Sequence, residues 1–92
     1  MNSEQFNQAT NIVKNLRQKP DQEELLKLYG LFKQAKIGDN NKEKPGIFNF
    51  QEKYKWESWN NYKGMNKESA EKEYVILVNS LIKKYKLKKI IN

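Results

Sequence analysis

The segment spanning residues 21–37 carries the side chains best suited to binding chemistry. The spacing of its apolar residues predicts one helix. At about 100° per residue, four of these side chains fall in one arc, which is enough to pack against a core. Leu25, Leu26 and Tyr29 extend the apolar surface beyond that arc, and Lys33 lies one turn after Tyr29. An apolar surface edged by a cation and a phenol suits an amphipathic ligand whose anionic part meets the lysine. The core arc itself consists of Leu28, Leu31, Phe32 and Ala35.

A second lysine and further tyrosines occur in two later segments. Lys55 follows Tyr54 in one of them, and Tyr74 lies near the middle of the other. If these helices converge, Lys33 and Lys55 together with Tyr29 and Tyr74 surround one phosphate-binding site. Each residue also has a purely structural interpretation. An isolated lysine is usually solvated, and a helical tyrosine often packs in the core with its hydroxyl at the surface.

Two absences exclude whole classes of catalyst. The 92 residues include no cysteine and no histidine, which excludes disulfides, thiolate nucleophiles, Ser-His-Asp triads and the usual zinc and haem ligands. The neighbouring carboxylates Glu23 and Glu24, and the pair Glu71 and Glu73, are typical of a first helical turn and of a solvated helix face. An enzyme that uses carboxylates is therefore the weakest of the functional hypotheses. The lack of cysteine favours a cytoplasmic location.

The charge balance indicates an anionic partner. Lys and Arg number 18 against 11 Asp and Glu, which leaves a formal net charge of +7. Five of the lysines fall within residues 83–89. Such a run is ordinary at the C-terminus of a helix, but it also suits nucleic acid or an anionic membrane. A basic helical module acting through this run is therefore the alternative function.

Apolar periodicity and end signals predict four helices, over residues 3–16, 21–37, 51–62 and 66–88. Ser3 and Asn66 are expected as N-caps, Asp21 and Glu24 have capping-box spacing, and Gly38 is expected just past the second helix. No window of period-two alternation predicts a strand. Four amphipathic helices in a chain of this length indicate a single all-α domain, a four-helix bundle.

The connection over residues 38–49 is long for a helix bundle, where roughly 2–8 residues are usual. Long loops in compact domains often shape binding sites. Ile47, Phe48 and Phe50 are expected to pin this one to the core. Trp56 and Trp59, one turn apart, are expected mainly in the core, since aromatic side chains bury large areas.

Three stretches closely resemble the signature of the acyl-CoA-binding protein family. They are LYGLFKQAKIGD at residues 28–39, the pair Pro45-Gly46, and KWESW at residues 55–59. Similar residues recur elsewhere along the chain, at Phe6, Ala9, Val13, Lys19-Pro20, Lys63-Gly64 and Tyr74. The resemblance covers about residues 3–86. We therefore expect a ligand-binding domain over residues 3–88 and a short basic and apolar tail over residues 89–92.

The resemblance implies an up-down-down-up four-helix bundle with a shallow bowl for the ligand. Family members bind medium- and long-chain acyl-CoA esters with high affinity and act as intracellular carriers and pool formers, without catalysis. The resemblance thus implies long-chain fatty acyl-CoA as ligand and a cytoplasmic monomer with no cofactor or metal. It implies no nucleic-acid partner, and transient contacts with anionic membranes or with enzymes that use acyl-CoA.

Family positions also assign roles to individual residues here. By resemblance, three residues hold the ribose 3′-phosphate and the adenine: Tyr29, Lys33 and Lys55. Two aromatic residues line the same end, Phe32 and Tyr74, and one cation lies near the phosphates, Lys14. Three residues lie close to the acyl chain, Leu25, Leu26 and Tyr54, and the signature also includes Gly30 and Leu31.

Two positions depart from the family pattern. Phe32 stands where many members have tyrosine, so the ring contact persists without the hydrogen bond of the hydroxyl. Tyr54 stands where the family is often small, and a bulky ring there changes the shape of the acyl groove. This second departure bears on the preferred chain length more than on the class of ligand.

Overall fold

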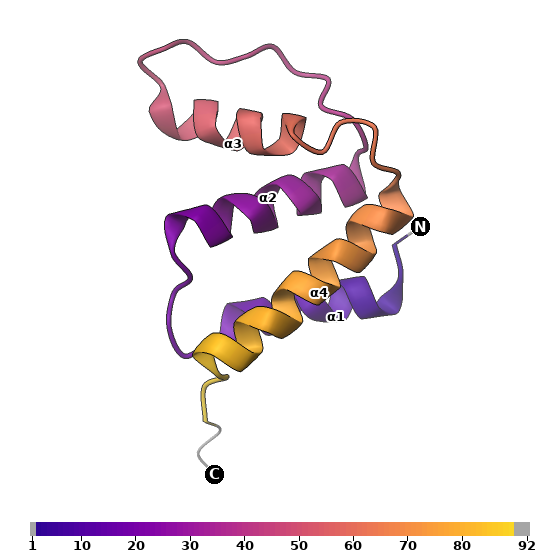
Figure 1. The fold of residues 1–92 in the computed structure, drawn as a ribbon, viewed down its shortest axis with the longest axis vertical. Coiled ribbons are helices and arrows are strands. Elements are labelled where there is room, and N and C mark those ends of the chain that lie inside the picture. Colours follow the sequence, from indigo (N-terminus) through magenta and orange to yellow (C-terminus); the bar gives the residue numbers. More distant parts are fainter. Residues whose placement is uncertain (1, 90–92) are drawn as a thin grey trace.

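The computed structural model describes residues 2–89, and it confirms an all-α, four-helix fold (Figure 1). Helices α2 and α3 run in the same direction, while α1 and α4 run the opposite way, which is the up-down-down-up order (Figure 1). Within the described residues, none of the helices combines the length and apolar character needed to span a membrane. The elements are α1 (Glu4–Ile12), the 3-10 turn η1 (Val13–Asn15), α2 (Gln22–Lys36), α3 (Phe50–Asn60) and α4 (Lys67–Tyr85).

Local capping interactions start three of the helices where the sequence predicts. The side chains of Ser3 and Asn66 each accept a hydrogen bond from the backbone N–H three residues later, at 3.1 and 2.7 Å. Asp21 and Glu24 form a complete capping box, with bonds of 2.9 and 3.0 Å. These bonds satisfy N–H groups that the first turn of a helix otherwise leaves without partners.

The last helix ends earlier than predicted. It stops at Tyr85 rather than at residue 88, because Lys86 adopts a positive φ of 66°. The chain then forms an isolated antiparallel bridge between Leu16 and Leu87, flanked by two backbone hydrogen bonds of 2.8 Å. This pairing with the α1–α2 connection is a long-range contact, so helical periodicity could not reveal it. Of the predicted tail, residues 90–92 lie outside the described part of the chain.

The core lies where α1, α2 and α4 meet. Helix α4 packs against both α1 and α2, and α3 packs on the outer side of α2 (Figure 1). At the centre, Phe6 meets Tyr74 edge to face, with ring centroids 5.1 Å apart. Trp59 of α3 is 1% exposed and lies in the interior, as predicted, whereas Trp56 is half-buried. The buried apolar residues of the core cluster are Phe6, Ala9, Leu16, Leu28, Leu31, Ala35, Ala70, Tyr74, Val78 and Leu81.

The prediction that apolar side chains pin the long loop to the core is wrong. Ile47, Phe48 and Phe50 are 67, 89 and 61% exposed. The loop is held instead by the polar edges of two tryptophans. The indole N–H of Trp56 donates to a loop carbonyl at residue 42, at 2.7 Å, and that of Trp59 donates to the carbonyl of residue 38, at 2.8 Å. A buried indole requires such an acceptor, and the loop backbone supplies it.

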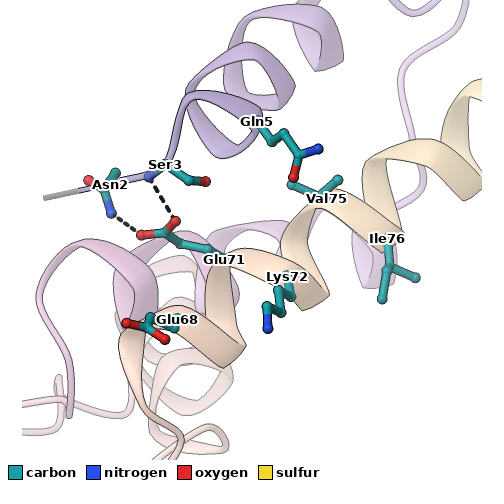
Figure 2. Close-up of a pocket in the computed structure, with 8 residues that line it drawn as sticks. All are labelled: Asn2, Ser3, Gln5, Glu68, Glu71, Lys72, Val75 and Ile76. Atoms are coloured by element: carbon teal, nitrogen blue, oxygen red, sulfur yellow. Dashed lines mark hydrogen bonds between the residues drawn. The ribbon is translucent and has the colours of Figure 1, made fainter.

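Glu71 also differs from expectation, since it does not lie on a solvated face. Its side chain is buried, and its carboxylate accepts hydrogen bonds from the Ser3 backbone N–H at 2.9 Å and the Asn2 side chain at 2.7 Å (Figure 2). Burial raises the pKa of Glu71, but these hydrogen bonds outweigh it and hold the pKa below its ordinary value. The carboxylate thus ties the start of α1 to α4.

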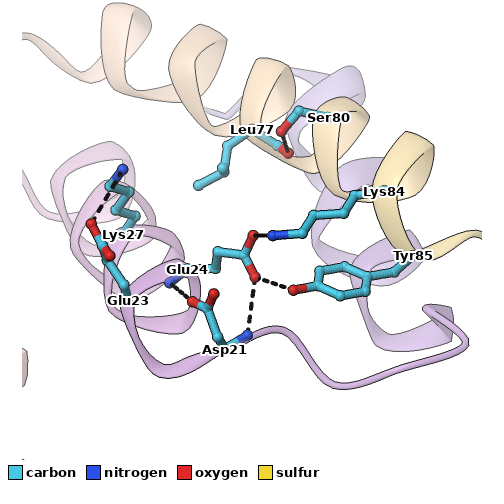
Figure 3. A network of polar contacts seen from close by, with 8 residues as sticks. All are labelled: Asp21, Glu23, Glu24, Lys27, Leu77, Ser80, Lys84 and Tyr85. Atoms are coloured by element: carbon cyan, nitrogen blue, oxygen red, sulfur yellow. Dashed lines mark hydrogen bonds and ion pairs between the residues drawn. The ribbon is translucent and has the colours of Figure 1, made fainter.

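A polar cluster joins the start of α2 to the end of α4 (Figure 3). Besides its capping bond, Glu24 accepts hydrogen bonds from the Lys84 ammonium at 2.8 Å and the Tyr85 hydroxyl at 2.5 Å. The bond from Lys84, followed by that from Tyr85, lowers the pKa of Glu24 from its ordinary 4.5 to about 2. One of the lysines of the basic run therefore has a structural partner.

This cluster predicts a specific acid dependence of stability. A carboxylate whose pKa is lower in the folded state than in the unfolded state stabilises the fold at every pH above its unfolded pKa. This contribution is lost as the pH falls toward the folded pKa and the folded carboxylate binds a proton. For Glu24 we therefore expect the loss as the pH falls from 4.5 to about 2. Denaturant titrations at several pH values should show a shallower acid loss in Glu24→Gln than in the wild type. The matched control is Glu23→Gln, since Glu23 is exposed and faces Lys27 at 4.0 Å. Equal acid dependence in the wild type and Glu24→Gln would contradict the prediction.

Candidate functional site

A close contact between α2 and α3 builds the candidate site. At Gly30 a Cβ atom would lie 2.6 Å from the backbone oxygen of Ser58, 2.7 Å from its Oγ and 2.8 Å from the ring of Tyr62. The Ser58 hydroxyl also donates to the backbone carbonyl of Leu26. Only a glycine permits this approach. The contact brings α3, which carries Lys55, beside α2, which carries Tyr29 and Lys33.

Two lysines from different helices meet at one tyrosine ring. The Nζ atoms of Lys33 and Lys55 lie 5.9 and 5.6 Å from the centroid of the Tyr29 ring. The Nζ atom of Lys33 is also 5.5 Å from the ring of Trp59, a buried residue of α3. The structure therefore brings Tyr29, Lys33 and Lys55 together. The sequence predicted this only on the condition that the helices converge. Placing two cations beside one phenol creates a cradle for a multiply charged anion.

The phenol of Tyr29 is suited to donate to such an anion. Burial raises the pKa of Tyr29, and the charge of Glu52 adds to the effect. The hydroxyl therefore keeps its proton at neutral pH. Glu52 also lies 3.9 Å from Lys55, with both side chains partly exposed. A pair of this kind contributes little stability, so Lys55 remains available for an incoming phosphate.

An open groove of about 550 Å³ extends from this cradle along α2. Leu25 and Leu26 form its apolar part, and Tyr29 and Lys55 also line it, whereas Lys33 is not among the lining residues. Sequence reasoning did not assign the two glutamines in its wall, Gln22 and Gln51. Lys19 and Pro20, which belong to the family resemblance, complete the lining. The groove thus joins a charged end to an apolar stretch.

Leu26 is shared with a second, smaller hollow of about 310 Å³ on the α3 side. Tyr54 lies in this hollow, 45% exposed, and not in the groove beside Tyr29. Leu26 is thus the residue that the groove and this hollow have in common. A ligand that reached Tyr54 from the cradle would pass over Leu26.

Phe32 and Tyr74 belong to a neighbouring aromatic cluster. The Phe32 ring lies 6.2 Å from Tyr74 and 5.9 Å from Phe6. Tyr74 is 4% exposed, as the structural interpretation of a core tyrosine predicts, and burial raises its pKa. Lys36 lies over this cluster, with its Nζ 5.9 Å from the Phe32 ring and 6.0 Å from the Phe6 ring. Sequence reasoning missed Lys36, although its spacing of four residues from Phe32 was a usable signal.

The remaining predicted residues lie outside the groove. Lys14 is exposed on η1 and is not among the groove-lining side chains. Leu31 is 5% exposed and belongs to the core, and Gly30 faces α3. These two residues of the signature therefore support the site through packing in this structure.

A larger hollow, of about 670 Å³, lies between the start of α1 and the outer face of α4 (Figure 2). Its ionisable side chains are Glu68, Glu71 and Lys72. Glu71 is already occupied by the two bonds from the N-terminal residues, and the carboxylates outnumber the single cation. This hollow is unsuited to a phosphate. Over residues 2–89, no cluster of three carboxylate, thiol or imidazole side chains is placed to hold a metal ion.

Comparisons with known proteins agree with this geometry. A family model described as "Acyl CoA binding protein" matches residues 3–78. The acyl-CoA-binding protein of Saccharomyces cerevisiae is 55% identical over 85 residues, which cover 92% of this chain and 98% of that protein. Identity of this extent over nearly the whole length of both chains indicates common ancestry.

Solved structures show the same fold. A solution structure of the acyl coenzyme A binding protein from yeast has a TM-score of 0.73 at 54% identity, covering 92% of this chain and 99% of that chain. The crystal structure of Oryza sativa acyl-CoA-binding protein 2 has a TM-score of 0.85 at 37% identity, covering 88% of each chain. The alternative of a basic module acting through residues 83–89 finds no support in these comparisons.

Proposed function

This chain belongs to the acyl-CoA-binding protein family, and we propose that it binds medium- and long-chain acyl-CoA esters. We propose further that it acts as an intracellular carrier and pool former, without catalysis. One observation carries the proposal. Lys33 and Lys55 reach the same Tyr29 ring, and Tyr29 and Lys55 line a groove with leucines in its wall.

The cradle at Tyr29 is proposed to hold the nucleotide end of the ligand. Coenzyme A carries a ribose phosphomonoester, and such a group bears about −1.5 to −2 charges at neutral pH. Lys33 and Lys55 supply two cations, and the phenol of Tyr29 supplies a hydrogen-bond donor. Phe32 and Tyr74 would line the aromatic side of this end. Lys14 is proposed as a further cation near the phosphates, and Lys36, over the neighbouring rings, is added to the predicted set.

The acyl chain is proposed to lie on Leu25 and Leu26. It would leave the cradle through the groove and pass over Leu26 toward Tyr54. Gly30 and Leu31 support this surface from beneath, through the contacts of α2 with α3 and with the core. Because Tyr54 is bulky, it would set how far the acyl chain extends in that direction.

Binding without catalysis is consistent with the residue content. The chain has no histidine and no cysteine, so no usual nucleophile–base pair stands beside a bound thioester. We propose that the protein is a cytoplasmic monomer that uses no cofactor and occupies residues 3–88 with its ligand-binding domain. Chromatography of palmitoyl-CoA after prolonged incubation with excess protein tests the proposed lack of hydrolysis.

Calorimetric titration with palmitoyl-CoA tests the proposed site. Charge-assisted hydrogen bonds contribute about 1.5–3 kcal/mol, so we expect Lys33→Ala and Lys55→Ala each to weaken binding by roughly tenfold or more. Lys72→Ala is the matched control, because Lys72 is an exposed lysine on α4 at the acidic hollow. It should bind as the wild type does. Wild-type affinity in both Lys33→Ala and Lys55→Ala would reject the site, and no binding by the wild type would reject the function.

A further inference from the structure

The turn before α3 presents large apolar side chains to solvent. The backbone N–H of Asn49 donates to the carbonyl of Gly46 at 3.0 Å, which closes a turn with Ile47 and Phe48 at its centre. These two side chains are 67 and 89% exposed, and Phe50, at the start of α3, is 61% exposed. We call Ile47, Phe48 and Phe50 the apolar tip.

The residue types of the tip are unusual for this local structure. The centres of turns favour Gly, Pro, Asn, Asp and Ser, each for a conformational reason. Ile and Phe have no such advantage there and gain no burial in this chain. A local preference that is broken without a packing benefit often marks a functional site. Clustered exposed apolar side chains likewise indicate an interaction surface.

The base of the loop is fixed while its tip protrudes. Trp56 and Trp59 hold the backbone at residues 42 and 38 through their indole N–H groups. Lys44 adds an ion pair with Glu57 at 3.8 Å, and its Nζ lies 5.8 Å from the Trp56 ring. The tip is thus held in place before any partner arrives, which reduces the ordering cost of an encounter. In Figure 1 this loop forms an outer edge of the molecule, beside α3.

We propose that the apolar tip inserts into the surface of an anionic lipid bilayer. Tyr54, one turn after Phe50 and 45% exposed, continues the apolar strip toward the hollow that contains Leu26. Aromatic side chains favour the membrane interface, and interfacial binding grows with the apolar area inserted and with attraction to anionic lipids.

Charge favours a bilayer over a protein partner. The chain carries a formal net charge of +7. A negative lipid surface attracts such a molecule as a whole. The tip also protrudes from the molecule, and a lipid bilayer can deform to accommodate a protruding side chain.

The test uses the full chain with vesicles of phosphatidylcholine containing about 30% phosphatidylserine, in the absence of acyl-CoA. In a sedimentation assay the double variant Ile47→Ser/Phe48→Ser should partition at least tenfold more weakly than the wild type. Ile76→Ser is the matched control, since Ile76 is 61% exposed on α4, and it should bind normally. The assay contains no acyl-CoA. A lack of vesicle binding would therefore reject the membrane proposal without affecting the proposed binding of acyl-CoA, which calorimetry tests separately.

A second measurement locates the inserted residue. The chain has no cysteine, so Phe48→Cys and Ile76→Cys each accept a single environment-sensitive fluorophore. A blue shift on vesicle addition at position 48 but not at position 76 would support insertion. Equal shifts at both positions, no vesicle binding by the wild type, or wild-type binding by the tip variant would each overturn it. Loss of binding in Lys86→Gln/Lys88→Gln/Lys89→Gln, combined with wild-type binding by Ile47→Ser/Phe48→Ser, would assign the contact to the basic run. Tip-dependent self-association without vesicle binding would also overturn the proposal.

Discussion

Palmitoyl-CoA should bind this chain about a thousandfold more tightly than free coenzyme A. Burying a methylene contributes about 0.8 kcal/mol, so ten methylenes contribute about 8 kcal/mol before the costs of ordering the chain and the protein. If those costs take about half, roughly 4 kcal/mol remains, which is a factor of about a thousand. Parallel calorimetric titrations with the two ligands measure the ratio.

One substitution separates the apolar end of the site from the charged end. Leu26→Asn keeps the size of the side chain but places an amide where the groove and the smaller hollow meet. We expect this variant to lose about tenfold in palmitoyl-CoA affinity, since the polar group loses water when the chain covers it. Its affinity for free coenzyme A should not change. Ile76→Asn, the same type of exchange at an exposed position of α4, serves as control.

Two outcomes would contradict this division. Equal affinity for palmitoyl-CoA and free coenzyme A would mean that the groove does not bury the acyl chain. Parallel losses for both ligands in Leu26→Asn would mean that Leu26 supports the cradle instead of the chain. By contrast, Lys33→Ala and Lys55→Ala should weaken both ligands by similar factors, because their partner is the nucleotide.

Gly30→Val should separate α2 from α3 and abolish ligand binding. The new Cβ would meet the Ser58 backbone oxygen at 2.6 Å, and a backbone atom cannot move aside without moving its helix. Valine raises helix propensity relative to glycine by only a few tenths of a kcal/mol. Overpacking of this kind costs about 1–3 kcal/mol and occasionally more, and we expect about 3 kcal/mol here. Denaturant unfolding measures the loss, and calorimetry measures the binding defect.

Gly46→Val is the matched control for that substitution. A Cβ at Gly46 would meet no atom within 4 Å, and its backbone does not have the positive φ of Gly38 and Gly64. This variant should therefore fold with nearly wild-type stability and bind palmitoyl-CoA normally. A stable Gly30→Val variant that still binds the ligand would show that the α2–α3 contact does not position Lys55 at Tyr29.

Helix type, helix starts and the apolar stripe could be predicted from the sequence alone. Their causes are local: the Ser3 and Asn66 caps and the Asp21–Glu24 capping box act within one helical turn. The spacing of Tyr29 and Lys33 likewise fixes one half of the cradle, since residues four apart share a helix face. The family resemblance extended this to a ligand and to the positions expected to hold it.

Tertiary structure decided the features that depend on distant parts of the chain. Helix α4 ends at Tyr85 because the following residues pair with the α1–α2 connection, and Glu71 is buried because the N-terminal residues bond to it. The tip at Phe48 faces solvent because two tryptophan N–H groups hold the loop at its base, so that its apolar side chains are not needed to anchor it.

The meeting of Lys33 with Lys55 has the same kind of origin. The two lysines lie on different helices, and periodicity describes each helix without placing it against another. Their distance is set by how closely α2 approaches α3, and the absence of a side chain at Gly30 permits that approach. A glycine inside a helix usually weakens it, so its structural role becomes visible only when the neighbouring helix is in view. The sequence by itself thus determined which residues could bind a phosphate and an apolar chain, and packing between helices decided which of them share one site.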